Sequence, residues 1–181
     1  MTKKSGSFRF LLEIFAVIII TVLIFTKIVI PVKIQGESMY PTLHNNDTII
    51  VNSLYLDRSD IKRFDIVVLK SDKLDEKIIK RVIGLPGDTI VFEDDKLYIN
   101  GSYYEETYLD KDYIEEAKKK YNAQLFTEDF KVTLKDDEIF VLGDNRLRSS
   151  DSRTLGTFKY DDIIGKKGIV VFPLKNMKFI N

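Results

Sequence analysis

Hydrophobic and polar positions divide this 181-residue chain into one long apolar segment followed by a series of short apolar runs. The long segment, residues 8–30, reads FRFLLEIFAVIIITVLIFTKIVI, and its central part carries no charged residue. At ~1.5 Å of rise per residue, a helix of this length approaches the ~30 Å thickness of a bilayer core. A helix that is apolar on all faces is typical of a membrane span. The pattern therefore predicts a transmembrane helix over residues 8–30.

The charges at the start of this segment predict its orientation. Three basic residues and one acid occur there: Lys3, Lys4, Arg9 and Glu13. Because basic residues favour the cytoplasmic side, we expect a short cytoplasmic tail at residues 1–7 and an extracytoplasmic domain at residues 31–181. A cleaved secretory signal peptide would need a small-x-small cleavage site after the apolar segment, and the sequence has none there. We therefore expect an uncleaved signal anchor whose helix is closed by Pro31.

Beyond residue 33 the pattern changes to short β-branched and aromatic runs that are separated by turns, which is typical of β-structure. The predicted strands are residues 48–51, 64–69, 77–83, 89–92, 96–99, 138–142 and 167–172. One segment differs, because residues 110–135 are charged and poor in β-branched residues. Within it, residues 114–121 place glutamates one helical turn before lysines. The exported part is therefore predicted to be mostly β, with residues 110–135 as a solvated helix or a flexible insertion.

Composition and charge exclude several classes of function. Lys and Arg total 28 and Asp and Glu total 28, so the formal net charge is zero and nucleic acid is not an expected partner. The chain has no cysteine and one histidine, which excludes disulfides, a cysteine nucleophile and zinc sites built on several histidines. We expect no metal and no other cofactor. The single histidine, His44, lies in a polar turn and is interpreted as a solvated loop residue rather than as a catalytic base.

Ser38 and Lys80 are the candidate catalytic residues. Ser38 follows the apolar segment by eight residues, so it is expected close to the outer membrane surface. Lys80 falls in the predicted strand 77–83, where alternation places it on one face with Ile78 and Val82. A free lysine has a pKa near ~10.4 and is protonated at neutral pH. Burial beside apolar neighbours disfavours the ammonium, so it can bring the pKa to the ~7–8 that a general base needs.

Three motifs, in this order, resemble the conserved boxes of bacterial type I signal peptidases. They are Ser38-Met39-x-Pro41-Thr42-Leu43, Lys80-Arg81-x-x-Gly84-x-Pro86-Gly87-Asp88 and Gly143-Asp144-Asn145-Arg146-x-x-Ser149-x-Asp151-Ser152-Arg153. Residues 63–68 resemble a further box, and the single anchor resembles the Gram-positive members. The resemblance spans nearly the whole chain. It implies a mostly antiparallel β-sheet catalytic domain behind one N-terminal transmembrane helix, and an endopeptidase that removes signal peptides from exported preproteins after Ala-x-Ala-like sites.

The resemblance also implies roles for individual residues. Ser38 would be the nucleophile and Lys80 the general base, and the Ser38 backbone N–H would contribute to the oxyanion hole. In some members a serine two positions before the nucleophile adds a hydroxyl donor, but this chain has Gly36 there, so the second donor stays open. Ile34 and Ile79 would line shallow pockets for small substrate residues.

The third motif would supply the residues that support the site. Ser149 would hydrogen-bond the lysine, and four charged residues would hold the site in shape: Asp144, Arg146, Asp151 and Arg153. The family usually has Asp-Asn where this chain has Leu147-Arg148, so the contacts made at those two positions are open. The expected partners are the signal peptides of exported preproteins and the lipid bilayer.

Two other functions stay open on the sequence. The Ser-Met pair and the β-rich pattern also resemble the self-cleaving Ser-Lys proteases of SOS-response repressors, although those lack an anchor and carry a DNA-binding head. A membrane-anchored β module that only binds partners would need neither Ser38 nor Lys80. Cleavage of a precursor, with and without those two side chains, distinguishes the three.

Overall fold

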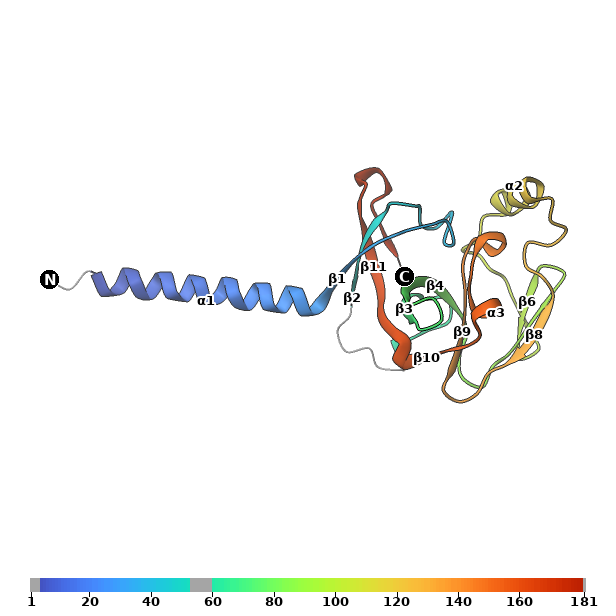
Figure 1. The fold of residues 1–181 in the computed structure, drawn as a ribbon, viewed down its shortest axis with the longest axis horizontal. Helices are drawn as coiled ribbons and strands as arrows, with labels where there is room; N and C mark the ends of the chain where they lie inside the picture. Colours follow the sequence, from blue (N-terminus) through green and yellow to red (C-terminus); the bar gives the residue numbers. More distant parts are fainter. Residues whose placement is uncertain (1–3, 53–59, 181) are drawn as a thin grey trace.

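The structure, a computed structural model, describes residues 4–52 and 60–180. Helix α1 (Lys4–Ile28) projects from one side of a β-rich domain (Figure 1). Its large apolar side chains between Phe8 and Val22 are exposed. Within the two described ranges, no helix is long and apolar enough to cross a membrane.

The expectation that the helix extends through residue 30 and is closed by Pro31 is wrong. α1 ends at Ile28, and residues Val29–Lys33 form strand β1, which pairs with strand β2 (Thr48–Asn52). Pro31 therefore lies inside a strand, opposite Ile50. The physical reason is that β1 is the outermost strand of its sheet, where a missing backbone donor on the free edge is tolerated.

The larger of two sheets has the strand order β1-β2-β11-β3-β4-β9-β10, with β12 also paired to β11. Its pairs are antiparallel. The strands beyond β2 are β3 (Ile66–Ser71), β4 (Glu76–Gly84), β9 (Glu138–Leu142), β10 (Phe158–Lys159), β11 (Ile163–Phe172) and β12 (Lys178–Ile180). The mostly antiparallel β-domain that the sequence predicts is thus confirmed.

A second sheet of four strands has the order β7-β6-β5-β8. Its strands are β5 (Thr89–Glu93), β6 (Lys96–Ile99), β7 (Ser102–Tyr104) and β8 (Phe130–Thr133). Helix α2 (Lys111–Tyr121) stands at the end of the domain that is remote from α1 (Figure 1). The charged segment 110–135 therefore contains a helix and also β8. Short helical turns η2 (Arg146–Arg148), α3 (Ser152–Leu155), η3 (Tyr160–Asp162) and η4 (Leu174–Asn176) complete the fold.

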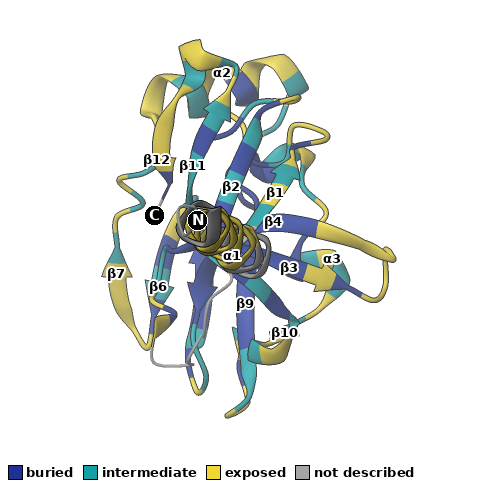
Figure 2. Ribbon diagram, turned by 90° about the vertical axis from the view of Figure 1, so that its left-hand side faces the viewer, coloured by how far each residue is buried: buried dark blue, intermediate teal, exposed yellow. Residues whose placement is uncertain are grey.

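Apolar residues cover both faces of the larger sheet, as the buried strands in Figure 2 show. In β3, Ile66 and Val68 pack in one cluster, and Val67 and Leu69 pack in the other. Strand β4 runs beside β3 and is buried from residue 78 to residue 84. Lys80 lies opposite Val67 in this pair, and paired residues share a face, so the one lysine of a buried stretch is placed among apolar side chains.

Candidate functional site

Ser38 lies in the loop between β1 and β2, and contacts on two sides fix this loop. On one side, Met39 is 2% exposed and Leu43 is fully buried, so the residues after Ser38 are anchored in the apolar core. On the other side, the Asn145 backbone N–H donates to Ser38 O at 3.0 Å, and Asn145 Nδ2 donates to Glu37 O at 3.1 Å. The backbone of the candidate nucleophile is therefore held between the core and the loop after β9.

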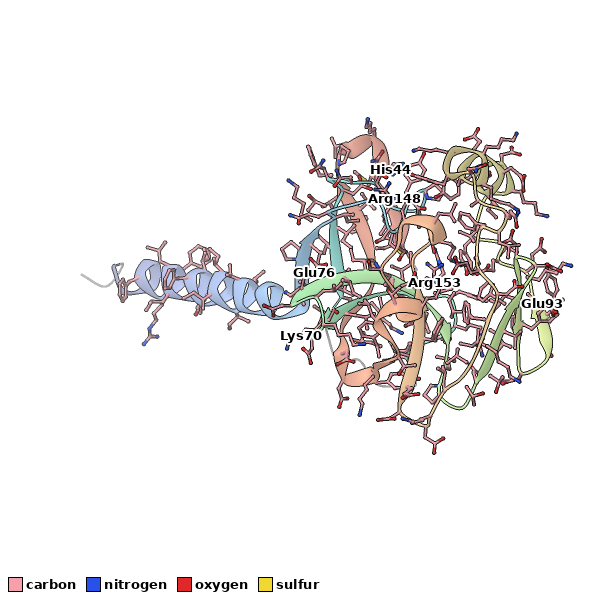
Figure 3. All side chains as sticks on the ribbon, turned by 45° about the vertical axis from the view of Figure 1, so that its right-hand side comes forward. His44, Lys70, Glu76, Glu93, Arg148 and Arg153 are labelled. Atoms are coloured by element: carbon pink, nitrogen blue, oxygen red, sulfur yellow. The ribbon has the colours of Figure 1, made fainter. Side chains whose placement is uncertain are left out.

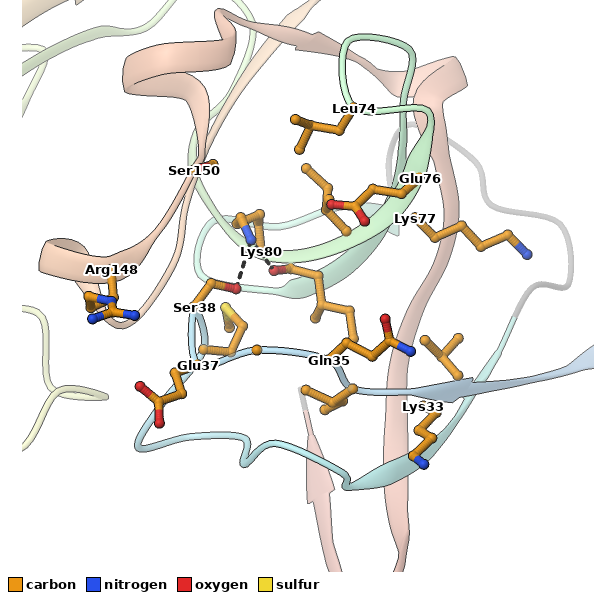
Figure 4. A pocket seen from close by; sticks show the side chains of 16 residues that line it. Lys33, Gln35, Glu37, Ser38, Leu74, Glu76, Lys77, Lys80, Arg148 and Ser150 are labelled. Carbon is orange, nitrogen blue, oxygen red and sulfur yellow. Dashed lines mark hydrogen bonds between the residues drawn. The ribbon is translucent and has the colours of Figure 1, made fainter.

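Lys80 Nζ lies 2.9 Å from Ser38 Oγ and donates a second hydrogen bond to Ile79 O at 3.0 Å (Figure 4). Lys80 is only 3% exposed. This burial lowers the pKa of Lys80 from the ordinary 10.5 to about 8, although the carboxylates of Asp151, Glu76 and Asp144 oppose the change. About a tenth of the amine is therefore unprotonated at pH 7, next to a serine hydroxyl, against well under a thousandth for a free lysine.

His44 and Gly36 lie in different surroundings. The side chain of His44 is 44% exposed, and its Nδ1 lies 3.7 Å from Asp47 Oδ2. Gly36 adopts φ +90°, a conformation that disfavours a side chain, and its N–H donates to Asn45 Oδ1 at 3.1 Å. Within the described residues, the backbone N–H of Ser38 donates to no other group. It is therefore available to a substrate oxygen, whereas the N–H of Gly36 is engaged.

Asp151 and Arg153 form a bidentate ion pair beside the site. Arg153 Nε and Nη2 each lie 2.9 Å from a different carboxylate oxygen of Asp151, and the Gly143 N–H donates to Asp151 Oδ2 at 3.0 Å. Although burial disfavours the carboxylate, Arg153 and the Gly143 N–H hold the pKa of Asp151 below its usual range. Arg153, which is labelled in Figure 3, also donates to Arg146 O at 2.7 Å. The pair therefore ties both ends of the loop 143–153 together.

Asp144 is fully buried and makes a second bidentate pair with Arg81, the residue after Lys80. Arg81 Nε and Nη2 lie 2.8 and 2.6 Å from the two oxygens of Asp144, and the guanidinium stacks over the Tyr108 ring at 4.0 Å. Asp144 also accepts a hydrogen bond from Thr42 Oγ1. It thereby joins strand β4 to the segment that carries Ser38.

Arg146 is buried beneath the loop 143–153, where it makes structural contacts. Its guanidinium lies 2.6 Å from Glu106 Oε1, 3.0 Å from Thr127 Oγ1 and 2.9 Å from Gly143 O. Sequence reasoning selected Arg146 but missed its partners, and it also left out Arg81 and Asn145. Arg81 and Asn145 both stand inside the quoted motifs. The signal that could have identified them is a charge directly after Lys80 and an amide directly after Asp144.

The hydrogen bond from Ser149 to Lys80 that the resemblance implies is absent from the structure. Ser149 Oγ is buried and has no hydrogen-bond partner among the described residues. It packs on Gly143 instead: a Cβ at Gly143 would lie 2.2 Å from Ser149 Oγ and 2.4 Å from Ser38 O.

An open cleft of about 450 Å³ runs from the end of β1 past the Ser38–Lys80 pair (Figure 4). Ile34 and Ile79, the predicted pocket residues, both line it and are nearly buried. Arg148, which stands where the family usually has Asn, lines it as well. Among the described residues, no three His, Cys, Asp or Glu side chains are grouped so that they could hold a metal ion. The arrangement is a serine hydroxyl beside a desolvated amine at the edge of an open cleft.

Comparisons with known proteins identify relatives of this chain. A family model described as "Signal peptidase, peptidase S26" matches residues 7–172. Signal peptidase I P of Bacillus subtilis subsp. natto is 40% identical over 179 residues, covering 97% of this chain and 95% of its own length. Signal peptidase I S of Bacillus subtilis strain 168 is 38% identical over 183 residues, covering 100% and 97%. A crystal structure of a signal peptidase I from Enterococcus faecalis, 38% identical, covers 59% of this chain and 95% of its own, with a TM-score of 0.49.

Proposed function

The chain belongs to the signal peptidase family, peptidase S26, and on that premise we propose that it cleaves signal peptides from exported preproteins with a Ser38–Lys80 dyad. Members of this family are serine endopeptidases, so the reaction class follows from membership, and the proposal concerns the residues that perform it. One observation carries it: the amine of a lysine that is 3% exposed lies 2.9 Å from a serine hydroxyl at the edge of a cleft.

In the proposed mechanism, neutral Lys80 accepts the Ser38 hydroxyl proton while Ser38 Oγ attacks the scissile carbonyl. The resulting lysine ammonium then protonates the leaving amine, and the C–N bond breaks to give an ester between the signal peptide and Ser38. Lys80, neutral again, takes a proton from water, which attacks the ester and frees the signal peptide and the Ser38 hydroxyl. The lowered pKa of Lys80, about 8, suits a group that must accept and return a proton.

The oxyanion of the tetrahedral intermediate would be stabilised by the Ser38 backbone N–H, which has no other acceptor among the described residues. Gly36 does not offer a second donor in the structure, because its N–H is bonded to Asn45. Asp144 is proposed as a positioning residue because it joins the strand of Lys80 to the segment that carries Ser38. Arg146, Asp151 and Arg153 are proposed as positioning residues because they hold the loop 143–153 in shape. Ser149 belongs with them through its packing on Gly143.

The substrate would bind as an extended segment along the cleft, with backbone hydrogen bonds and with alternate side chains in pockets. Ile34 and Ile79 line the cleft with little of their surface exposed, and they are proposed to floor shallow pockets for small side chains. Two such pockets at alternate positions would select Ala-x-Ala before the scissile bond.

We further propose that residues 8–30 anchor the protein in a bilayer, with residues 1–7 in the cytoplasm and residues 31–181 outside as the catalytic domain. Apolar side chains of α1 are exposed along its described length, which supports contact with lipid. The sheet edge β1-β2-β11-β12 lies on the side of the domain from which α1 projects (Figure 2). Four large apolar side chains are exposed there: Phe172, Leu174, Met177 and Phe179. Loss of membrane association on deletion of residues 1–28, which leaves strand β1 whole, would test the anchor.

The dyad is tested by cleavage of a purified precursor whose signal peptide ends in Ala-x-Ala. Ser38→Ala and Lys80→Ala should each abolish turnover while circular dichroism shows an intact fold. Lys70→Ala, which changes an exposed lysine of the neighbouring strand β3, and His44→Ala should keep most of the activity. An active Lys80→Ala protein together with an inactive His44→Ala protein would contradict the dyad. A folded wild-type protein that binds the precursor without cleaving it would favour the binding module instead.

A further inference from the structure

A second hollow of about 310 Å³ adjoins the catalytic cleft and lies beneath helix α2. It is lined by Glu37, Tyr40, Tyr113, Glu116, Ala117, Lys120, Tyr121 and Asn145, and we name it the α2 pocket. Glu37 lines both hollows, so they meet at the residue that precedes Ser38. Asn145 also borders it and holds the Ser38 carbonyl at 3.0 Å. The α2 pocket thus borders the segment that carries Ser38.

The walls of the α2 pocket are held in place. Asp110 caps the start of α2, and Ala117 is buried against Leu109 and Phe126. Lys118 Nζ lies 2.9 Å from Asp95, on the side of the second sheet. Such fixed walls are typical of a binding site that exists before its ligand arrives.

Aromatic contacts connect this helix to the Ser38 segment. The Tyr113 ring lies 5.8 Å from the Phe126 ring on one side and 5.4 Å from the Tyr40 ring on the other. Because Tyr40 is two residues after Ser38, the position of α2 is coupled to the loop that carries the nucleophile.

The geometry of an extended substrate decides which part of it reaches this pocket. The residues before the scissile bond occupy the cleft beside Ile34 and Ile79, at the end of β1 and therefore toward α1. A chain whose scissile carbonyl is at Ser38 Oγ must continue away from that side. Three residues of extended chain span ~10 Å, and α2 stands at the end of the domain remote from α1 (Figure 1).

We propose that the α2 pocket is the subsite for the first residues of the mature part of a precursor, and that its charged rim selects basic over acidic side chains there. The rim carries two carboxylates, from Glu37 and Glu116, against one ammonium, from Lys120. Burial raises the pKa of Tyr113, and the neighbouring groups of Tyr121, Tyr40, Asp144 and Glu37 add to the rise. This inference rests on the proposed function, because it takes Ser38 as the point of attack.

The test compares two precursors that are identical through the Ala-x-Ala site and carry either two lysines or two glutamates at the second and third positions after it. The wild-type protein should have the higher kcat/KM for the lysine precursor. One charge pair near 4 Å in water changes an equilibrium constant about fivefold. Glu116→Lys should therefore lower the preference for lysine at least about fivefold, mainly through KM, and Lys120→Glu should raise it.

Matched controls come from the same helix. Glu115→Lys and Lys119→Glu make the same charge changes at exposed positions outside the pocket lining, and should leave the preference close to the wild-type value. Truncated substrates that end one residue after the scissile bond should be insensitive to all four changes.

Normal cleavage of both precursors with an unchanged preference in Glu116→Lys and Lys120→Glu would overturn the subsite and leave the proposed function intact. An equal response in the control variants would also overturn it, because the effect would then come from the general electrostatic field of the helix and not from binding in the pocket. Failure of the wild-type protein to cleave either precursor would instead contradict the proposed function.

Discussion

Replacing Lys80 with methionine should stabilise the folded protein at neutral pH even though it removes the proposed base. The pKa of Lys80 falls from 10.5 to about 8 on folding, because burial disfavours the ammonium. Each pH unit corresponds to ~1.4 kcal/mol, so the protonated lysine costs the folded state ~3 kcal/mol relative to the unfolded chain. Loss of the amine's hydrogen bonds offsets ~1 kcal/mol of that. We therefore expect Lys80→Met to be more stable by ~2 kcal/mol near pH 7.

The pH dependence of the free energy of unfolding distinguishes the buried Lys80 from a surface lysine. Between about pH 8 and pH 10.5 the unfolded chain binds more protons at Lys80 than the folded protein does, so wild-type stability should gain ~3 kcal/mol as the pH rises through this window. Urea unfolding of both proteins at a series of pH values measures the difference, and other titrating groups cancel. Lys77→Met, at an exposed position of the same strand, should stay within ~0.5 kcal/mol of wild type. A Lys80→Met protein that is less stable at neutral pH, with a pH-independent difference, would refute this reasoning.

Two further changes test the support of the site. Asp144→Ala leaves the buried guanidinium of Arg81 unpaired and should lower the free energy of unfolding by ~3–5 kcal/mol, measured by urea denaturation; a loss below ~1 kcal/mol would contradict the role of the pair. Gly143→Ala places a Cβ 2.4 Å from Ser38 O and 2.2 Å from Ser149 Oγ, so the nucleophile must move. Its kcat/KM for precursor cleavage should fall ~100-fold or more while near-UV circular dichroism shows a folded protein, whereas near-normal activity would mean that the Ser38 backbone tolerates displacement.

The strands could be predicted from sequence where their own side chains determine them. Strand β4 is an unbroken buried run, and β5 and β6 flank a short turn, so pattern and turn chemistry agree with the structure. Strand β8 could not be predicted, because Phe130–Thr133 is four residues long within a charged segment and depends on pairing with β5. Strand β1 was hidden for a related reason: its residues continue the apolar run of α1, and only pairing with β2 makes them a strand.

The candidate site shows the same division between local and long-range information. The burial of Lys80 follows from its neighbours in β4, but its contact with Ser38 joins residues 42 positions apart, and only the resemblance to known motifs suggested it. The pairing of Arg81 with Asp144 spans 63 positions and carries no local signal. The bond from Ser149 to Lys80 that the resemblance implies is absent, because a resemblance supplies residue types and not the packing around them.

The pH dependence of kcat/KM for precursor cleavage tests the central claim most directly. Lys80 must be unprotonated to accept the Ser38 proton, and its pKa is about 8. Activity should therefore rise as the pH increases from about 6 to about 9, with a midpoint near the pKa of Lys80. Active-site titration at each pH would show that the concentration of folded enzyme stays constant. A rate that is flat between about pH 5 and pH 9 would contradict a Ser38–Lys80 dyad.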